Sequence, residues 1–324
     1  MKEQQLLFIA YKIQNNKINI CLISFIYYLY VRDLTMNKKR ALVLSGGGSK
    51  GAFQVGVLKY LIGELNNQYD IYTGISVGAL NASFLSQFPK GKEKEALENL
   101  VNIWNKINKG NIYHNHRPFG KLEALWKSSV YDSSPLKDFV YNNLDPVKVK
   151  ESGNELRISA CSLLTGNLKV WNEKDTDVIR DAVLASSSFP VMFNPIKIND
   201  DLFTDAGVKD IAPLSAAIDA GAEIIDIIVT SPFGSQPWKT KRKNSIKVLL
   251  RSVDLMSDEI LANDLIKLEK INKKVILGTA DPRYKYIEYN LYRPENLLTD
   301  NSLDFDRKLL DTMMVTGYKT VTEK

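Results

Sequence analysis

The sequence predicts one α/β domain with a mostly parallel central sheet, and three observations lead to this fold class. The chain has 324 residues, 44% of them hydrophobic, so it is long enough to bury one large core. Short apolar runs, glycine-rich turns and helical periodicity alternate twice between residues 41 and 88, which is typical of βαβ units and a parallel sheet. The same alternation returns between residues 213 and 230.

The first half of the chain contains two predicted strand–helix units and an insertion. A strand is predicted at Ala41–Ser45, an apolar run that ends in glycines as buried parallel strands do, and helical spacing follows from Ala52 to Leu65. A second strand at Ile71–Ile75 leads into a second helix at Val77–Phe88. Residues 90–150 are more polar and have a turn-rich middle, so we expect a helical insertion there.

The second half of the chain begins with a predicted antiparallel pair and then resumes the α/β alternation. The elements that we expect are strands at Leu156–Leu163, Asn167–Trp171, Ile196–Ile198 and Ile224–Thr230, and helices at Asp177–Ser187 and Pro213–Ala220. A longer helix has one apolar face that runs from Ile246 to Ile260. We therefore expect one domain over residues 37–324, with its core motifs within residues 41–231.

The first 36 residues differ from the rest of the chain. Ile20–Val31 is an uncharged run of twelve residues, shorter than the roughly 20 residues that a transmembrane helix needs. No small-residue cleavage site follows it, which argues against a signal peptide. Met36 precedes a basic cluster and the first strand, as a start residue would. We expect residues 1–36 to lie outside the fold, either as an over-long start or as a membrane-associating segment.

The charge distribution argues against a nucleic-acid partner. The net charge is +6, and the excess is not gathered into the several basic stripes that a nucleic-acid-binding protein would show. One stretch, Trp238–Arg251, is basic and free of acids. It is interpreted either as a solvated helix end or as a patch that contacts an anionic membrane surface at its periphery.

Cysteine and histidine are scarce. Cys21 and Cys161 form neither a disulfide framework nor a metal-binding spacing, which favours a reducing, cytoplasmic compartment and predicts no metal or other cofactor. His114 and His116 are the only histidines, and they flank Asn115 in a polar, turn-like segment that we interpret as solvated surface.

A glycine-rich loop follows the first strand. Gly46, Gly48 and Gly51 fit the G-x-G-x-x-G pattern of dinucleotide-binding folds. That function also requires an acidic residue at the end of the second strand, whereas Asp70 stands at its beginning. A P-loop is excluded because Lys50 is followed by glycine rather than by serine or threonine.

The sequence around Ser76 is more specific. Gly74, Ser76 and Gly78 form G-x-S-x-G between a predicted strand and a predicted helix, the context of a nucleophile elbow. The alternative is that Ser76 only caps the helix. If both glycine-containing turns lie at one sheet edge, the amides of Gly47 and Gly48 can face a carbonyl that Ser76 attacks. The glycine loop is therefore better suited to a tetrahedral oxyanion than to a pyrophosphate.

A serine nucleophile needs a base, and the sequence has no histidine after His116. A carboxylate that acts directly on the serine is the remaining option, and Asp205 is the best placed because it lies in a short turn after a strand and before a helix. Asp200 and Asp201 are predicted at a hairpin tip and Asp210 as a capping group. With the ordinary aspartate pKa near 3.9, such a base would be ionised well below neutrality.

These motifs together resemble those of the patatin-like phospholipases. The resemblance runs from Lys39 to Val229 and implies a three-layer α/β/α patatin-like fold. It implies a dyad of Ser76 and Asp205, an oxyanion hole from the backbone of Gly46, Gly47 and Gly48, and a loop-holding role for Lys50. The motif-supporting positions are Gly51, Gly74, Gly78, Ala206 and Gly207. Ala206 departs from the family's usual glycine and would cost of order 1 kcal/mol if its φ had to be positive.

The resemblance implies a serine lipid acyl hydrolase, which cleaves a lipid or phospholipid ester through an acyl-enzyme on Ser76. Two alternatives stay open at this point. An acyltransferase shares the G-x-S-x-G motif but normally pairs its serine with a histidine. A catalytically silent lipid-binding scaffold on the same fold would not need both Ser76 and Asp205.

Overall fold

The computed structural model describes residues 38–116, 120, 127–234 and 245–323. The predicted N-terminal extension and Cys21 lie outside the described residues, so the division between residues 1–36 and 37–324 stays a prediction. Residues 238–244, which are half of the basic stretch, also lie outside the described residues. In the part that is described, Lys247 pairs with Asp300, with 2.9 Å between Nζ and Oδ2.

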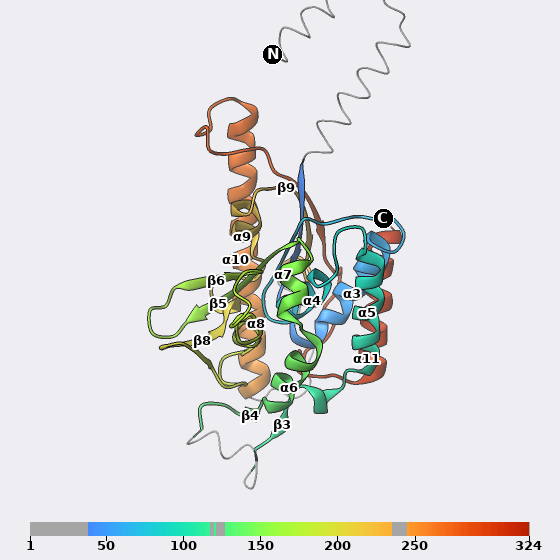
Figure 1. The fold of residues 1–324 in the computed structure, drawn as a ribbon, viewed down its shortest axis with the longest axis vertical. Coiled ribbons are helices and arrows are strands. Elements are labelled where there is room, and N and C mark those ends of the chain that lie inside the picture. Colours follow the sequence, from blue (N-terminus) through green and yellow to red (C-terminus); the bar gives the residue numbers. More distant parts are fainter. Residues whose placement is uncertain (1–37, 117–119, 121–126, 235–244, 324) are drawn as a thin grey trace, which may run out of the picture. The chain divides into compact units, whose positions relative to one another are not determined.

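An eight-stranded, mostly parallel sheet forms the centre of the fold (Figure 1). β1 (Lys39–Leu44) lies between β2 (Ile71–Gly74) and β9 (Ala222–Ile228) and is parallel to both. β10 (Glu288–Tyr292) extends the sheet beyond β9, and β5 (Glu155–Ser162) extends it beyond β2, both in parallel. The predicted fold class is confirmed.

The antiparallel part of the sheet is built around β5. β6 (Leu168–Asn172) pairs with residues 157–161 of β5, and β8 (Asp201–Asp205), itself paired with β7 (Ile196–Ile198), pairs with residues 160–162. Since β6 takes one edge of β5, β2 and β8 share the other edge. On this edge β2 pairs in parallel with residues 155–158 of β5 and points toward β8, which is antiparallel to β5. The carboxyl ends of β2 and β8 therefore face each other across Ser159.

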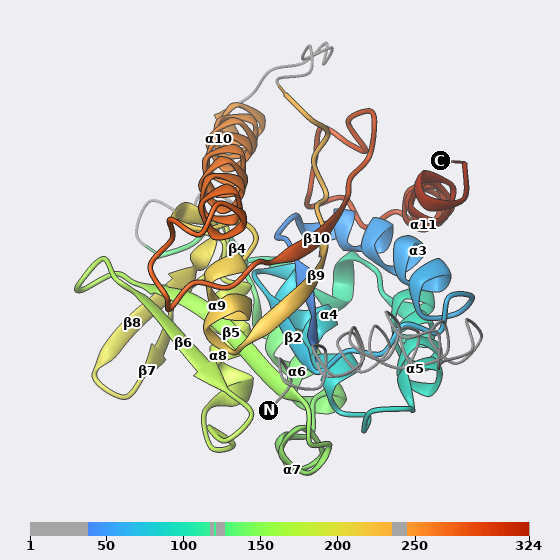
Figure 2. The same ribbon diagram turned by 90° about the horizontal axis from the view of Figure 1, so that it is seen from above.

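Helices cover both faces of the sheet, so the fold has three layers (Figure 2). On one face lie α9 (Leu214–Asp219) and the long helix α10 (Ser245–Ile276). The helices that pack on the other face are α3 (Gly51–Leu61), α4 (Val77–Ser86), α8 (Ile179–Ser186) and α11 (Arg307–Thr322). β1 supplies both cores, because successive side chains of a strand point to opposite faces: Leu42 belongs to one cluster and Val43 to the other.

The predicted helical insertion is present. Its elements are α5 (Glu93–Lys106), η2 (Lys109–Asn111), α6 (Ser134–Asn143) and α7 (Pro146–Glu151), with a small antiparallel ribbon of β3 (His114–Asn115) and β4 (Tyr131–Asp132). α5 and α6 contribute apolar side chains to the same core as α4. The insertion thus lies beside the helix that follows Ser76.

The C-terminal part of the fold contains two elements that were not predicted, β10 and α11. α11 packs closely on α3, because a Cβ atom at Gly56 would come within 2.0 Å of the Met314 carbonyl oxygen. Only glycine therefore allows the two helices to approach so closely. Within the described ranges, no helix is both long enough and apolar enough to cross a membrane.

Candidate active site

Ser76 occupies a strained turn between β2 and α4. Its φ is 57° and its ψ is −127°, a conformation that costs a non-glycine residue roughly 1–3 kcal/mol. Gly74 and Gly78 permit the turn, because a Cβ atom on Gly74 would lie 2.2 Å from the Gly78 carbonyl oxygen. The Ser76 side chain makes no capping hydrogen bond to α4. The geometry fits a nucleophile elbow better than a helix cap.

Asp205 ends β8 and is almost completely buried, with 2% of its surface exposed. Its Oδ1 accepts a hydrogen bond of 2.8 Å from the Gly207 amide. Burial raises the pKa of Asp205 to about 7, although this amide and the Ser76 hydroxyl, which both favour the ionised form, oppose the rise. The expectation of an ordinary aspartate pKa is therefore wrong, because the sequence does not reveal the desolvation of this carboxylate.

The serine-rich segment at the end of α8 connects Ser76 with Asp205. The Ser76 amide donates to Ser186 Oγ at 3.1 Å, and Ser187 Oγ donates to the Ser76 carbonyl oxygen at 3.2 Å. The carbonyl oxygen of the next residue, Ser188, accepts a bond of 3.0 Å from the Asp205 amide. The sequence predicts this segment only as the end of a helix, without a role in the site. Its three consecutive serines were the available signal.

The glycine loop lies against the same turn. The Gly46 amide donates to the Ile211 carbonyl oxygen at 3.1 Å, so it does not point at a substrate. The amides of Gly47 and Gly48 have no acceptor within the described part of the chain. The prediction that the Gly46 amide contributes to an oxyanion hole is therefore wrong, while a role of Gly47 and Gly48 in such a site stays a prediction.

Ala206, the departure from the family pattern, is not strained. It opens the short helix η4 (Ala206–Val208) and is not among the described residues with positive φ. The predicted cost of alanine at this position therefore does not arise.

Lys50 ties the glycine loop to α10. Lys50 belongs to η1 (Gly48–Lys50), its side chain is buried, and its Nζ lies 3.0 Å from Oδ1 of Asp254 on α10. A buried ammonium requires such a partner, since burial without one is costly. This contact is consistent with the loop-holding role that the resemblance implies.

A chain of buried amide and indole groups lies beneath the loop. Trp104 of α5 donates from Nε1 to Asn81 Oδ1 at 2.8 Å, and Asn81 Nδ2 donates to Gln54 Oε1 at 2.8 Å. Gln54 Nε2 in turn donates to the Ser45 carbonyl oxygen at 2.8 Å. The insertion is thus connected through α4 and α3 to the residue before the glycine loop.

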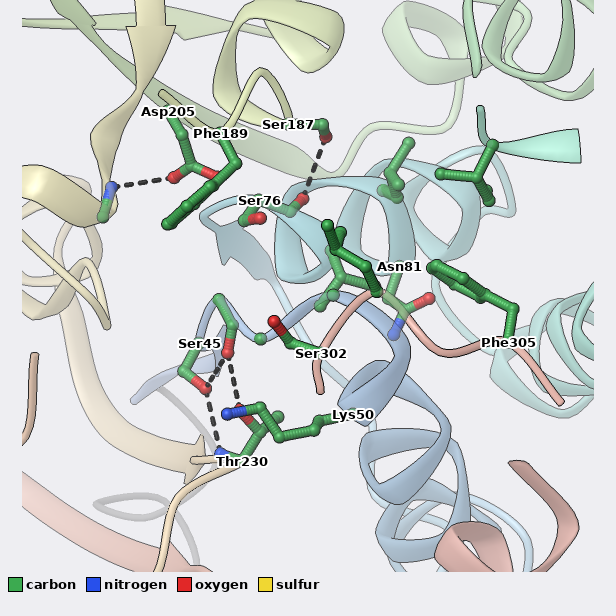
Figure 3. Close-up of a pocket in the computed structure, with 18 of the residues that line it drawn as sticks. Ser45, Lys50, Ser76, Asn81, Ser187, Phe189, Asp205, Thr230, Ser302 and Phe305 are labelled. Atoms are coloured by element: carbon green, nitrogen blue, oxygen red, sulfur yellow. Dashed lines mark hydrogen bonds between the residues drawn. The ribbon is translucent and has the colours of Figure 1, made fainter. Parts of the chain in front are cut away.

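Ser76 and Asp205 line one cavity (Figure 3). The side of this cavity formed by α4, α5 and α6 is apolar, with the side chains of Leu80, Phe84, Ile103, Trp104, Leu136 and Phe139. Gly47 and Gly48 line the same cavity together with the serine and the aspartate, so the cavity offers both polar groups and an apolar surface. An ester with a hydrocarbon chain matches this division, since apolar groups gain free energy when they leave water.

The other titratable candidates lie elsewhere. His114 is exposed on β3, and neither it nor His116 lines the cavity. The expectation that His116 is solvated is wrong, because it is buried, with Nε2 3.2 Å from the Ser129 carbonyl oxygen. Asp210 caps a turn by accepting from the Ala212 amide, as predicted. Asp70 precedes β2 and accepts a hydrogen bond from the Arg40 amide, away from the glycine loop.

The described residues contain no group of three or more histidine, cysteine or acidic side chains that could hold a metal ion.

Comparisons with known proteins give a family model and several similar proteins. The family model of the patatin-like phospholipases matches residues 42–218. The chain is 25% identical to the uncharacterized protein L620 of Acanthamoeba polyphaga mimivirus, over 57% of this chain and 65% of that protein. It is also 25% identical to the uncharacterized protein YjjU of Escherichia coli strain K12, over 59% of this chain and 52% of that protein. The alignments thus span between half and two thirds of these two relatives.

Two further proteins are similar to this chain. The chain is 22% identical to the probable lipid hydrolase 463L of Invertebrate iridescent virus 6, over 72% of this chain and 86% of that protein. Among solved structures, VipD from Legionella pneumophila matches with a TM-score of 0.42 and 14% identity, over 88% of this chain and 66% of that chain.

Proposed function

Because the chain belongs to the patatin-like phospholipase family, we propose that it is a lipid acyl hydrolase with Ser76 as nucleophile and Asp205 as general base. The observation that carries this proposal is the convergence of β2 and β8 on one edge of β5. It brings a strained serine and a buried carboxylate into one cavity with two backbone amides that have no acceptor among the described residues.

In the acylation step, Ser76 Oγ forms a bond to the ester carbonyl carbon while its proton passes to Asp205. The carbonyl oxygen becomes an oxyanion, and the amides of Gly47 and Gly48 donate hydrogen bonds to it. Collapse of this intermediate breaks the bond to the alcohol oxygen, which takes the proton from Asp205. The products are an acyl-enzyme on Ser76 and a free alcohol or lysolipid.

In the deacylation step, a water molecule attacks the acyl-enzyme while Asp205 takes one of its protons. A second oxyanion forms at the same amides, and its collapse releases the fatty acid as Ser76 Oγ recovers the proton. A pKa of about 7 suits this role, because a base that both accepts and returns a proton works best near its own pKa.

The apolar side of the cavity supports an acyl chain as the part of the substrate that enters the fold. A side chain such as Phe84 or Phe139 offers a hydrocarbon surface, and each buried methylene of a substrate is worth about 0.8 kcal/mol. With the acyl chain on this apolar surface, the ester carbonyl would lie beside Ser76, where the polar groups of the cavity are.

The test combines active-site labelling with hydrolysis of an ester series and a phospholipid. A fluorophosphonate probe should label the wild-type protein, and Ser76→Ala should abolish the label. Ser76→Ala and Asp205→Asn should each lower ester hydrolysis by roughly three orders of magnitude, as in other serine hydrolases. As a control, His114→Ala combined with His116→Gln should keep the rate within about three-fold of wild type, because the proposed reaction needs no imidazole.

Three results would contradict the proposal. Loss of activity in the folded double-histidine variant would point to an imidazole base. Transfer of the acyl group to an added alcohol in preference to water would favour the acyltransferase. A wild-type protein that binds lipid but neither reacts with the probe nor cleaves any ester would favour the silent scaffold.

A further inference from the structure

The carbonyl oxygen of Gly46 is held by two buried hydroxyl groups. Thr230 Oγ1 donates to it at 2.7 Å and Ser45 Oγ donates to it at 3.0 Å (Figure 3). The two hydroxyl-bearing residues are themselves connected, since the Thr230 amide donates to Ser45 Oγ at 3.1 Å. Thr230 lies just beyond the end of β9, and Ser45 just beyond the end of β1.

These bonds control the direction of a neighbouring amide. The Gly46 carbonyl and the Gly47 amide belong to one peptide unit, which is planar and trans, so the two groups point in opposite directions. A carbonyl that is fixed toward Thr230 therefore keeps the Gly47 N–H directed away from Thr230. That N–H is one of the two amides in the cavity without an acceptor in the described part of the chain.

The loop needs such a restraint because glycine imposes little of its own. Gly47 has a φ of 150°, in a region that glycine enters freely and other residues rarely adopt. Glycine is also required at this position for Thr230 to approach, since a Cβ atom on Gly47 would lie 2.2 Å from Thr230 Oγ1. The close approach of Thr230 requires a flexible glycine at position 47, and the hydrogen bond from Thr230 to the Gly46 carbonyl restrains that glycine.

The second amide of the loop is held in a different way. The Gly48 N–H shares its peptide unit with the Gly47 carbonyl, which accepts a bond of 3.2 Å from the Lys50 amide within the turn of η1. The local turn is therefore sufficient for Gly48, whereas Gly47 depends on the side chains of two residues that follow the strands β1 and β9.

We propose that Thr230 and Ser45 are positioning residues, which orient the Gly46–Gly47 peptide so that the Gly47 amide stabilises the oxyanion. This inference rests on the proposed hydrolase function. Neither side chain is required to touch the substrate, because each acts through the Gly46 carbonyl. Removal of the hydroxyl groups should therefore weaken the stabilisation of the transition state without an equal loss of ester binding.

The experiment compares Thr230, just beyond the end of β9, with Thr73 on β2. Thr230→Val removes the hydroxyl that holds Gly46 with little change in volume, and Thr230→Ser keeps that hydroxyl. Thr73→Val on β2 is the matched control, because Thr73 is also buried but its hydroxyl has no hydrogen-bond partner among the described residues. The measurements are kcat and KM for a short p-nitrophenyl ester and the thermal midpoint of each variant.

Complete removal of an oxyanion donor lowers kcat by about 10²–10³-fold, and a misdirected donor should cost less, so we expect Thr230→Val to lower kcat about 10–100-fold. KM should stay within about three-fold of wild type, since an interaction made only in the transition state does not contribute to ground-state binding. Thr230→Ser should restore most of the lost rate, and Thr73→Val should leave kcat unchanged. Ser45→Ala should lower kcat in the same direction and serves as the second variant if Thr230→Val does not fold.

The outcomes separate this inference from the function on which it rests. An active wild-type protein whose folded Thr230→Val and Ser45→Ala variants keep the full kcat would overturn the positioning role alone. Equal losses of kcat in Thr230→Val and Thr230→Ser would also overturn it, because the hydroxyl would then not be responsible. A wild-type protein without esterase activity or probe labelling would overturn the proposed function, and the positioning role with it.

Discussion

Substitution of Asp205 by asparagine should make the protein more stable, and increasingly so as the pH rises. Burial raises the pKa of Asp205 from 3.8 to about 7, so the folded state favours the protonated carboxyl. A group whose pKa is raised in this direction destabilises the folded state as the pH climbs from its unfolded value through its folded one. Asparagine is neutral throughout, and its Oδ1 can still accept the bond from the Gly207 amide.

The magnitude follows from the size of the shift. A difference of about 3 pKa units at 1.36 kcal/mol per unit gives a penalty of about 4 kcal/mol at pH 8, where the folded wild type carries the buried charge. At pH 5 the carboxyl is protonated in the folded state but ionised in the unfolded chain. Folding must then bind a proton, and the remaining penalty is only about 1.5 kcal/mol. The advantage of Asp205→Asn should therefore grow by about 3 kcal/mol between pH 5 and pH 8.

The assay is urea denaturation of wild type, Asp205→Asn and Ser76→Ala at both pH values. The stability difference between variant and wild type is compared at the two pH values, so any pH-independent cost of the asparagine cancels. The effects of other titrating groups cancel as well, such as that of Asp210, whose pKa is raised by burial to about 6. Ser76→Ala is the control from the same cavity, because it leaves the Asp205 carboxylate in place. A stability difference between Asp205→Asn and wild type that is the same at pH 5 and pH 8 would refute this reasoning.

Three further predictions follow from the same cavity and its supports. Because only ionised Asp205 can accept a proton, kcat/KM for an ester should rise about ten-fold per pH unit up to about pH 7 and then level off. A flat pH profile of kcat/KM from pH 5 to pH 8 would contradict this prediction. Asp254→Asn leaves the buried Lys50 ammonium without its carboxylate and should cost about 1–3 kcal/mol of unfolding free energy, as measured by urea denaturation. Lys50→Met in the same chain should restore most of this loss, because it removes the buried charge. Phe84→Ala lengthens the apolar side of the cavity and should raise kcat/KM for longer acyl esters relative to shorter ones. The increase should be about four-fold for each added methylene that is buried. An unchanged chain-length preference would show that the acyl chain binds elsewhere.

Much of the fold could be read from local patterns. The strand at Ala41–Ser45 and the helix after Ser76 were predicted to within two residues at each end, because a short apolar run and a helical period are properties of adjacent residues. α11 was missed although Leu310, Met313, Met314 and Gly317 supply the required spacing. β10 offered no such pattern, because its residues lie at the edge of the sheet and are only partly buried.

For the site, the sequence by itself determined the chemical groups and the local backbone that presents them. G-x-S-x-G predicted the strained turn at Ser76, because only small neighbours permit it, and the run of glycines predicted a loop with accessible amides. Only the tertiary structure decided that β2 and β8 meet on one edge of β5, that Gly46 donates to Ile211, and that Thr230 holds the Gly46 carbonyl. It also decided the pKa of Asp205. Desolvation and many hydrogen-bond partners depend on residues that are distant in the chain, as Gly46 and Ile211 or Ser45 and Thr230 are, and no local pattern shows which residues will surround a given side chain.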